Sequence, residues 1–162
     1  MTDCQFCNFI EQKTNVLFSD ESVVVMLSPQ PVAGGHLLVL PKKHAPIIEV
    51  VPDDVVGRLF SAANKAGVAV FEALGAQGTN ILVQNGPSAG QVYNHVLLHV
   101  IPRFEGDSVE LLWTPKQASE DELSQIAEKL TQKETVNVEK KKDASDDVSE
   151  DDLRVKHLLR IP

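Results

Sequence analysis

Apolar and polar positions follow one another along the first half of the chain in blocks that predict its secondary structure. Residues 22–27 (Ser-Val-Val-Val-Met-Leu) and 37–40 (Leu-Leu-Val-Leu) are short runs rich in β-branched and aliphatic side chains, so we expect two strands. Between them, residues 29–35 read Pro-Gln-Pro-Val-Ala-Gly-Gly, which neither a helix nor a central strand tolerates. These strands are therefore expected to be joined by a turn.

A long helix is predicted after the second strand. The run Pro52-Asp53-Asp54 is typical of a helix start with acids in the first turn, and Gly75 supplies a stop. Between them, apolar or small residues recur at helical spacing, at Val55, Val56, Leu59, Phe60, Ala63, Gly67, Val70 and Leu74.

The remaining pattern predicts two more strands and a last helix. Residues 79–84 and 96–102 are expected to be strands separated by a Gly-Pro-Ser-Ala-Gly loop. Ser119 and Glu122 form a capping box that opens a helix to about Gln132. With a short N-terminal helix, this order predicts an α+β fold, an antiparallel sheet with a long helix packed on it and a C-terminal helix.

The C-terminal thirty residues differ in composition from the body. From Lys133 onward there are seven Lys/Arg and eight Asp/Glu, with little to bury. We therefore predict one domain over residues 1–132, a flexible charged linker over 133–152 and a tail over 153–162. The tail carries an apolar stripe that either docks on a surface or stays solvated.

Composition narrows the classes of function. The chain of 162 residues is 43% hydrophobic and 23% charged, which is typical of a globular domain. Its net charge of −8 argues against strong nucleic-acid binding, and 5% aromatic residues against a stacking platform for single strands. We see neither a membrane-spanning run nor a signal peptide, so we expect a cytoplasmic protein with no membrane contact.

Two cysteines and two histidines are candidates for a metal site. Cys4-x-x-Cys7 can present two thiolates, and His44 and His95 follow or precede predicted strands. Two thiolates with two imidazoles suit a tetrahedral Zn²⁺. Taken alone, however, the cysteines are equally consistent with buried or redox thiols, and each histidine with ordinary packing.

The chain resembles the histidine-triad (HIT) superfamily over most of residues 4–113. The resemblance rests on Cys-x-x-Cys, on Pro31-Val-Ala-Gly-Gly-His-Leu-Leu-Val-Leu-Pro-Lys-Lys-His44, on Asn85-Gly86, and on the run Gly90-Gln-Val-Tyr-Asn-His-Val-Leu-Leu-His-Val-Ile-Pro-Arg103. The order and spacing of these motifs together are highly specific.

Several expectations follow from this resemblance. It implies a HIT-like fold that forms a homodimer with a continuous sheet and binds nucleotides, usually purine ones, in nucleotide hydrolases or transferases. It also implies a structural zinc held by Cys4, Cys7, His44 and His95.

The sequence departs from the HIT pattern where the family does chemistry. Leu97 stands at the place of the middle histidine, the family's nucleophile, and a leucine cannot form a nucleotidyl intermediate. His99 is retained, but in the family it orients rather than attacks. Ser28 replaces a common ribose-binding aspartate, and Val92 a common hydroxyl donor. We therefore expect no catalytic residue, and a ligand pocket formed by Leu27, Ser28, Gln84, Asn85, Gly90, Gln91 and His99.

We favour a catalytically impaired, zinc-containing pseudoenzyme that binds a purine nucleotide or a related phosphate ligand. The backbone amides of residues 86–90 could face a phosphate, although this segment could also be a plain turn. One alternative is an enzyme that uses His99 as a general base or zinc as a Lewis acid. Another is a pure protein-interaction module. Arg103, with Glu105 and Asp107, is consistent either with a local salt bridge or with a dimer contact.

Overall fold

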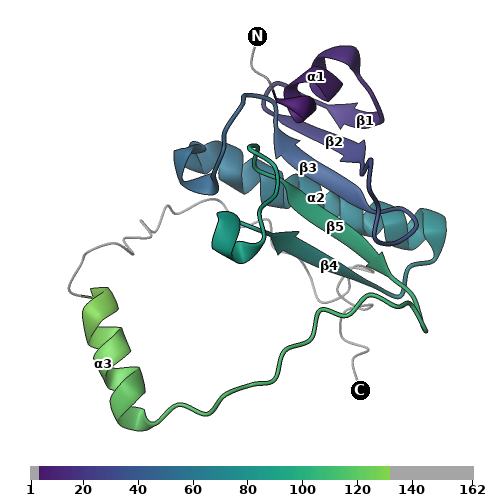
Figure 1. Cartoon of the computed structure of the whole chain (residues 1–162). Helices are drawn as coiled ribbons and strands as arrows, with labels where there is room; N and C mark the ends of the chain where they lie inside the picture. The colour runs from purple at the N-terminus through teal and green to yellow at the C-terminus, as the bar shows by residue number, and fades with distance from the viewer. Residues whose placement is uncertain (1–3, 132–162) are drawn as a thin grey trace, which may run out of the picture. The chain divides into compact units, whose positions relative to one another are not determined.

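The computed structural model describes residues 4–131, which belong to two compact units, Met1–Leu112 and Trp113–Pro162. Figure 1 shows the elements. The first unit contains α1 (Gln5–Gln12), β1 (Val16–Ser19), β2 (Val23–Leu27), β3 (Leu37–Pro41), the 3-10 turn η1 (Ile48–Val50), α2 (Asp53–Leu74), β4 (Gly78–Val83), the 3-10 turn η2 (Pro87–Ala89) and β5 (Leu98–Arg103). The second unit contains α3 (Glu120–Thr131).

The five strands form one sheet in the order β1-β2-β3-β5-β4, and every neighbouring pair is antiparallel. β5 lies between β3 and β4, so that His99 faces Leu38 on one side and Leu82 on the other. The predicted α+β class with an antiparallel sheet is confirmed.

The two faces of the sheet are covered differently. Alternate residues of β2, β3 and β5 pack against α2, which lies behind the strands in Figure 1. The intervening residues turn to the opposite face, because side chains alternate along a strand. There Val24, Met26, Leu38 and Leu40 form a second cluster with Phe6 of α1 and with Leu97, which precedes β5. The candidate site residues of β5 lie on this second face.

The long helix begins and ends as the sequence predicts. Asp53 and Asp54 occupy its first turn, and Gly75 ends it at a φ of +68°, which glycine adopts without strain. Its buried face consists of Leu59, Ala63, Ala66, Gly67 and Val70. Phe60 was expected on that face but is 45% exposed, because it lies one step around the helix from Leu59.

Other boundaries differ from the sequence prediction. β1 was not predicted, because a strand of four mostly exposed residues is too short to show an alternating pattern of apolar and polar positions. β5 begins at Leu98 rather than at residue 96, so His95 and Leu97 lie in the irregular segment before the strand.

The last helix and the C-terminal predictions fall partly outside the described residues. The capping box is confirmed, because the Glu122 amide donates to Ser119 Oγ over 3.3 Å and the Ser119 amide to Glu122 Oε2 over 2.9 Å. The predicted linker over 133–152 and tail over 153–162 lie outside these residues, and the extent of a 1–132 domain stays a prediction. Among the described residues, no helix is long and apolar enough to cross a membrane.

Candidate functional site

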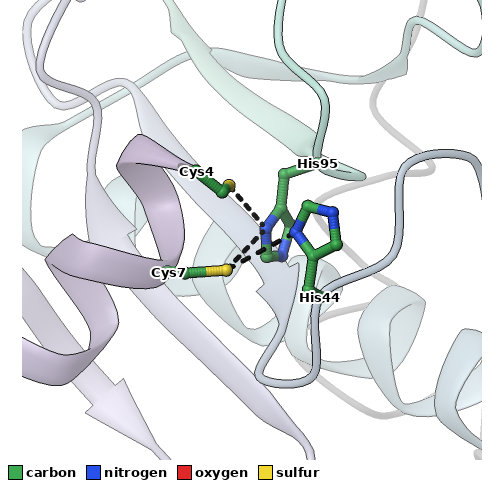
Figure 2. A group of neighbouring side chains, drawn as sticks. All are labelled: Cys4, Cys7, His44 and His95. Carbon is green, nitrogen blue, oxygen red and sulfur yellow. Dashed lines mark hydrogen bonds between the residues drawn. The ribbon is translucent and has the colours of Figure 1, made fainter. Parts of the chain in front are cut away.

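Four side chains from distant parts of the sequence meet at one end of the sheet, as Figure 2 shows. Cys4 precedes α1 and Cys7 lies in its first turn, His44 follows β3, and His95 precedes β5. One sulfur or nitrogen atom from each lies within 4.8 Å of the others. The predicted metal-binding set is therefore brought together by the fold.

The distances inside this cluster match those of a tetrahedral zinc site. His95 Nδ1 lies 3.5 Å from Cys4 Sγ and 3.8 Å from Cys7 Sγ, and His44 Nδ1 lies 3.5 Å from Cys7 Sγ. Usual Zn–S and Zn–N bond lengths with a tetrahedral angle place sulfur and nitrogen about 3.6 Å apart. The donor types and these three sulfur–nitrogen distances are therefore those of a zinc site.

A second contact fixes the tautomer of His95. Its Nε2 lies 2.9 Å from the Pro41 carbonyl oxygen, which can only accept, so Nε2 carries the hydrogen. Nδ1 is then left as a bare lone pair directed at the two sulfurs. Such a backbone contact on the remote nitrogen is typical of metal-binding histidines. Burial also lowers the pKa of His95, with a smaller effect from the charge of His44, which favours the neutral form that binds metals.

A shallow cleft adjoins this cluster. It is lined by Gln84, Gln91, Val92, Tyr93, His95, Leu97 and His99. His95 therefore borders both the metal cluster and the cleft. Of the predicted ligand residues, Gln84, Gln91 and His99 line it, whereas Leu27, Ser28, Asn85 and Gly90 do not.

His36 and His99 form a hydrogen-bonded pair, and a contact from Val32 determines which of the two histidines donates. The Val32 amide donates to His36 Nδ1 over 3.3 Å, so the hydrogen of neutral His36 is on Nε2. That Nε2 lies 3.1 Å from His99 Nδ1 and donates to it. His99 then keeps its own hydrogen on Nε2, which leaves a donor on a side chain that lines the cleft.

Both histidines of the pair are neutral at pH 7. Burial, and to a smaller extent repulsion from a protonated His99, lowers the pKa of His36 to about 4. Burial also lowers the pKa of His99. His36 was not among the predicted site residues, although the sequence carried a signal, a single polar residue between Gly35 and a run of buried aliphatic ones.

The loop between β4 and β5 uses most of its polar groups internally. The amides of Ala89, Gly90 and Gln91 donate to carbonyls of the same loop. The Gln91 side chain accepts from the Gly86 amide and donates to the carbonyls of Pro46 and Tyr93. The loop is therefore closer to a plain turn than to a loop whose free amides bind a phosphate. A ligand contact from Gln91 stays a prediction.

The other predicted ligand residues also have partners in the protein. Asn85 Oδ1 accepts from the Ile48 amide and Asn85 Nδ2 donates to Glu49. Ser28 Oγ accepts from the Gln30 amide over 3.3 Å. Tyr93 was missed by the sequence prediction; it lines the cleft, and its ring meets Phe6 edge to face at 5.0 Å.

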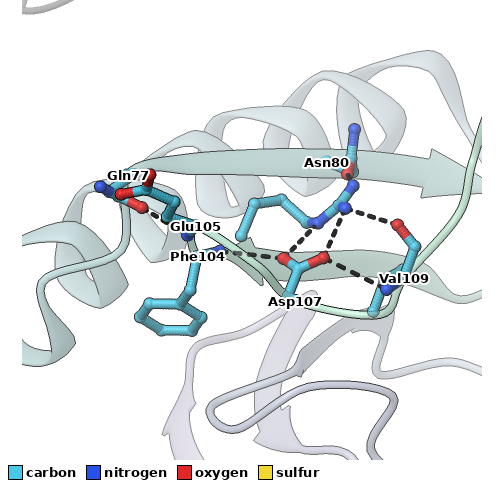
Figure 3. A network of polar contacts seen from close by, with 7 residues as sticks. Gln77, Asn80, Phe104, Glu105, Asp107 and Val109 are labelled. Carbon is cyan, nitrogen blue, oxygen red and sulfur yellow. Dashed lines mark hydrogen bonds and ion pairs between the residues drawn. The ribbon is translucent and has the colours of Figure 1, made fainter.

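Arg103 forms a local network and not an unpaired surface charge (Figure 3). Its guanidinium donates through Nε and Nη2 to the two carboxylate oxygens of Asp107, over 2.8 and 2.7 Å, and through Nη1 to Asn80. Glu105 is not a partner of Arg103; its amide donates to Gln77. The sequence left open a local salt bridge or a dimer contact for Arg103. The structure has the local salt bridge, between Arg103 and Asp107.

Comparisons with known proteins agree on one family. A model described as HIT domain matches residues 10–106. An uncharacterized HIT-like protein of Methanocaldococcus jannaschii is 42% identical over 106 residues, which cover 64% of this chain and 81% of that protein. An adenylylsulfatase of Arabidopsis thaliana is 38% identical over 107 residues, 65% of this chain and 54% of that protein.

A solved structure extends the similarity to the fold. The crystal structure of a zinc-bound histidine triad family protein from Mycobacterium smegmatis superimposes with a TM-score of 0.63 at 29% identity, covering 82% of this chain and 98% of that one.

Proposed function

Because the chain belongs to the HIT domain family, whose members are nucleotide hydrolases or transferases, we propose that it is a zinc-containing module that binds a nucleotide or related phosphate ligand without the covalent step. One observation carries this proposal. From the spacing of the motif we infer that Leu97 stands where the family has its nucleophile. Its side chain is buried, with 7% of its surface exposed, and His95 and His99 lie two residues before and after it in the sequence. The protein is then a catalytically impaired relative.

The proposed metal is zinc, held by Cys4, Cys7, His44 and His95. Four protein ligands leave no open position for a substrate or water, so its role is structural. Bound there, zinc would tie α1 to the ends of two strands. The zinc-bound relative from M. smegmatis supports the assignment of the metal.

The proposed ligand is an adenylyl compound. The relative from A. thaliana is named for action on adenylyl sulfate, and the cleft of this chain offers His99 Nε2–H as a donor to an anionic oxygen. Leu97 and Val92 add apolar surface to the cleft, which suits a base more than a second phosphate.

Calorimetry with AMP tests ligand binding. We expect wild-type protein to bind AMP and His99→Ala to bind it about 10-fold to 100-fold more weakly, because a hydrogen bond to a charged group contributes about 1.5–3 kcal/mol. Asn64→Ala, on the exposed face of α2, is the control and should bind as the wild type does. Equal affinity in all three proteins would contradict a role for His99.

Turnover tests the catalytic impairment. We expect no rapid release of AMP from adenylyl sulfate by wild-type protein. Leu97→His should restore measurable release of AMP, unless the other departures from the family pattern, Ser28 and Val92, also prevent turnover. Rapid release by the wild type would contradict the proposal and favour the alternative in which His99 acts as a general base; its rate would then follow the ionisation of His99 and be lost in His99→Ala.

We also propose that the protein is a cytoplasmic homodimer. β4 is an edge strand of the sheet and Ile81 on it is 42% exposed, so a second β4 could extend the ladder. Cys4 and Cys7 lie together in the proposed zinc site, where a metal needs them as reduced thiolates, and this suits a reducing compartment. Light scattering should give about twice the chain mass of 17.7 kDa. A monomer at micromolar concentration would contradict the dimer and leave the metal site unaffected.

A further inference from the structure

The helix α3 exposes an apolar stripe. Leu123, Ile126 and Leu130 are 57%, 52% and 57% exposed, and no residue of α3 is buried. With Ala127, these residues are spaced i, i+3, i+4 and i+7, so they lie on one face of the helix. A stripe of this kind on a helix normally packs against another element.

The length of α3 gives a second reason to expect a cover. It has 12 residues, and isolated helices shorter than about 12–15 residues are only marginally stable in water. Its capping box adds some stability at the first turn, but nothing among the described residues of its own unit, 113–131, covers the apolar face.

The charge of α3 indicates the chemistry of its cover. The helix contains four acids, Glu120, Asp121, Glu122 and Glu128, and one base, Lys129, a net charge of −3. Glu120 and Glu122 lie on either side of the apolar stripe, which follows from a rotation of 100° per residue. A second copy of the same helix would bring like charges together, so a basic and apolar partner is favoured.

One segment of the chain has this composition. Residues 153–162 contain three basic residues, Arg154, Lys156 and Arg160, and no acid, a net charge of +3 from side chains. The same segment contains five aliphatic residues, Leu153, Val155, Leu158, Leu159 and Ile161. We propose that this C-terminal segment binds the apolar face of α3 in its own chain, with its basic residues against the acids that flank the stripe.

The length of chain between the two segments allows this contact. Twenty-one residues, 132–152, separate them, and such a stretch can span up to about 70 Å when extended. The 12 residues of α3 extend over only about 18 Å at 1.5 Å per residue. The tail can therefore reach any point on the helix, and its attachment to the same chain raises its effective concentration.

Hydrogen exchange of the full chain tests the contact from the tail. Reversing all three tail charges (Arg154→Glu, Lys156→Glu and Arg160→Glu) should speed exchange of the amides of residues 123–131 at least 10-fold. The matched control reverses three lysines outside the tail (Lys140→Glu, Lys141→Glu and Lys142→Glu), and it should leave this exchange unchanged. Equal exchange in both variants and in the wild type would overturn the proposal.

A second pair of variants tests the contact from the helix. Ile126→Ser removes one member of the stripe at almost no cost in helix propensity, and Gln125→Ser changes the neighbouring residue on the opposite face at a somewhat greater cost. We expect faster exchange of the amides of residues 154–161 in Ile126→Ser only. Protection of the tail that rises with protein concentration would overturn binding within the chain and favour a second copy as the occupant.

Discussion

Leu97 belongs to the apolar cluster under α1 and also lines the cleft. Its side chain packs with Phe6, Leu38 and Leu40, on the same face of the sheet as His99. A histidine at this place would bring an imidazole into a largely apolar cluster, at a cost in desolvation. The leucine thus has a packing role in this cluster.

Truncation of Leu97 should destabilise the protein. We expect Leu97→Ala to lower the free energy of unfolding by about 2–4 kcal/mol, the usual cost of removing a buried leucine side chain. Leu27→Ala is the control, because Leu27 is 41% exposed at the end of β2 and its truncation should cost less than about 1 kcal/mol. Urea denaturation measures both, and equal losses would show that Leu97 is not part of the core.

The buried pair His36 and His99 should make stability depend on pH. The pKa of His36 is about 4 in the folded protein and near 6.5 in the unfolded chain, so the unfolded chain binds more protons between these values. The free energy of unfolding should therefore fall as the pH is lowered from about 6.5 to about 4, and this contribution should be constant above pH 7.

The test compares the pH slopes of two proteins. In His36→Gln the slope between pH 6.5 and 4.5 should be smaller than in the wild type, by on the order of 2 kcal/mol over the range. Any pH-dependent loss of metal affects both proteins and cancels in the difference. Parallel curves would contradict the assignment of a buried neutral His36.

Among the helices and strands, sequence patterns predicted those that bury either a long helical face with a regular apolar period or a continuous aliphatic run. α2 was predicted from its acids, its apolar period and Gly75, and β2 and β3 from their aliphatic runs. The late start of β5, at Leu98, was not predictable, because His95 is held by contacts with Pro41, Cys4 and Cys7, which lie at least 54 residues away in the sequence. The His36–His99 pair depends on contacts across 63 residues, which no local pattern contains.

One carboxylate makes four of the hydrogen bonds that hold the segment after β5. Asp107 binds Arg103 through both oxygens and also accepts from the amides of Phe104 and Val109. The Arg103 guanidinium and these amides hold the pKa of Asp107 well below its usual range. The turn of residues 104–109 thus depends on side-chain contacts and not on a strand or helix.

Removal of that charge should loosen the turn. We expect Asp107→Asn to increase the rate of limited proteolysis within residues 104–112, because a neutral amide cannot accept on both sides from Arg103. Glu105→Gln removes a neighbouring charge that is not bound to Arg103, and it should be cleaved at the wild-type rate. The same rate in both variants would show that Asp107 is not required for the turn.

At the scale of the molecule, the candidate metal centre connects parts that little else joins. α1 buries one fully enclosed side chain, Phe6, against the sheet, and Cys4 and Cys7 flank that residue. His44 and His95 come from segments that begin or end central strands. The ligand types were predictable from the sequence and their convergence from the family resemblance, whereas the geometry that brings them together depends on the register of β3 and β5.

Removal of the metal should therefore release α1 and lower the thermal stability of the whole first unit. We expect about one zinc per chain by elemental analysis, and a Tm lowered by on the order of 10 °C when a chelator removes it, because structural zinc contributes several kcal/mol to folding. The double variant Cys4→Ser, Cys7→Ser should show the lowered Tm without chelator and no further response to it. His36→Gln changes a buried histidine outside the metal cluster, and it should retain both zinc and the response to chelator. A wild-type protein that contains no metal and melts at the same temperature as the double variant would contradict the zinc site, since the four side chains would then be held only by packing.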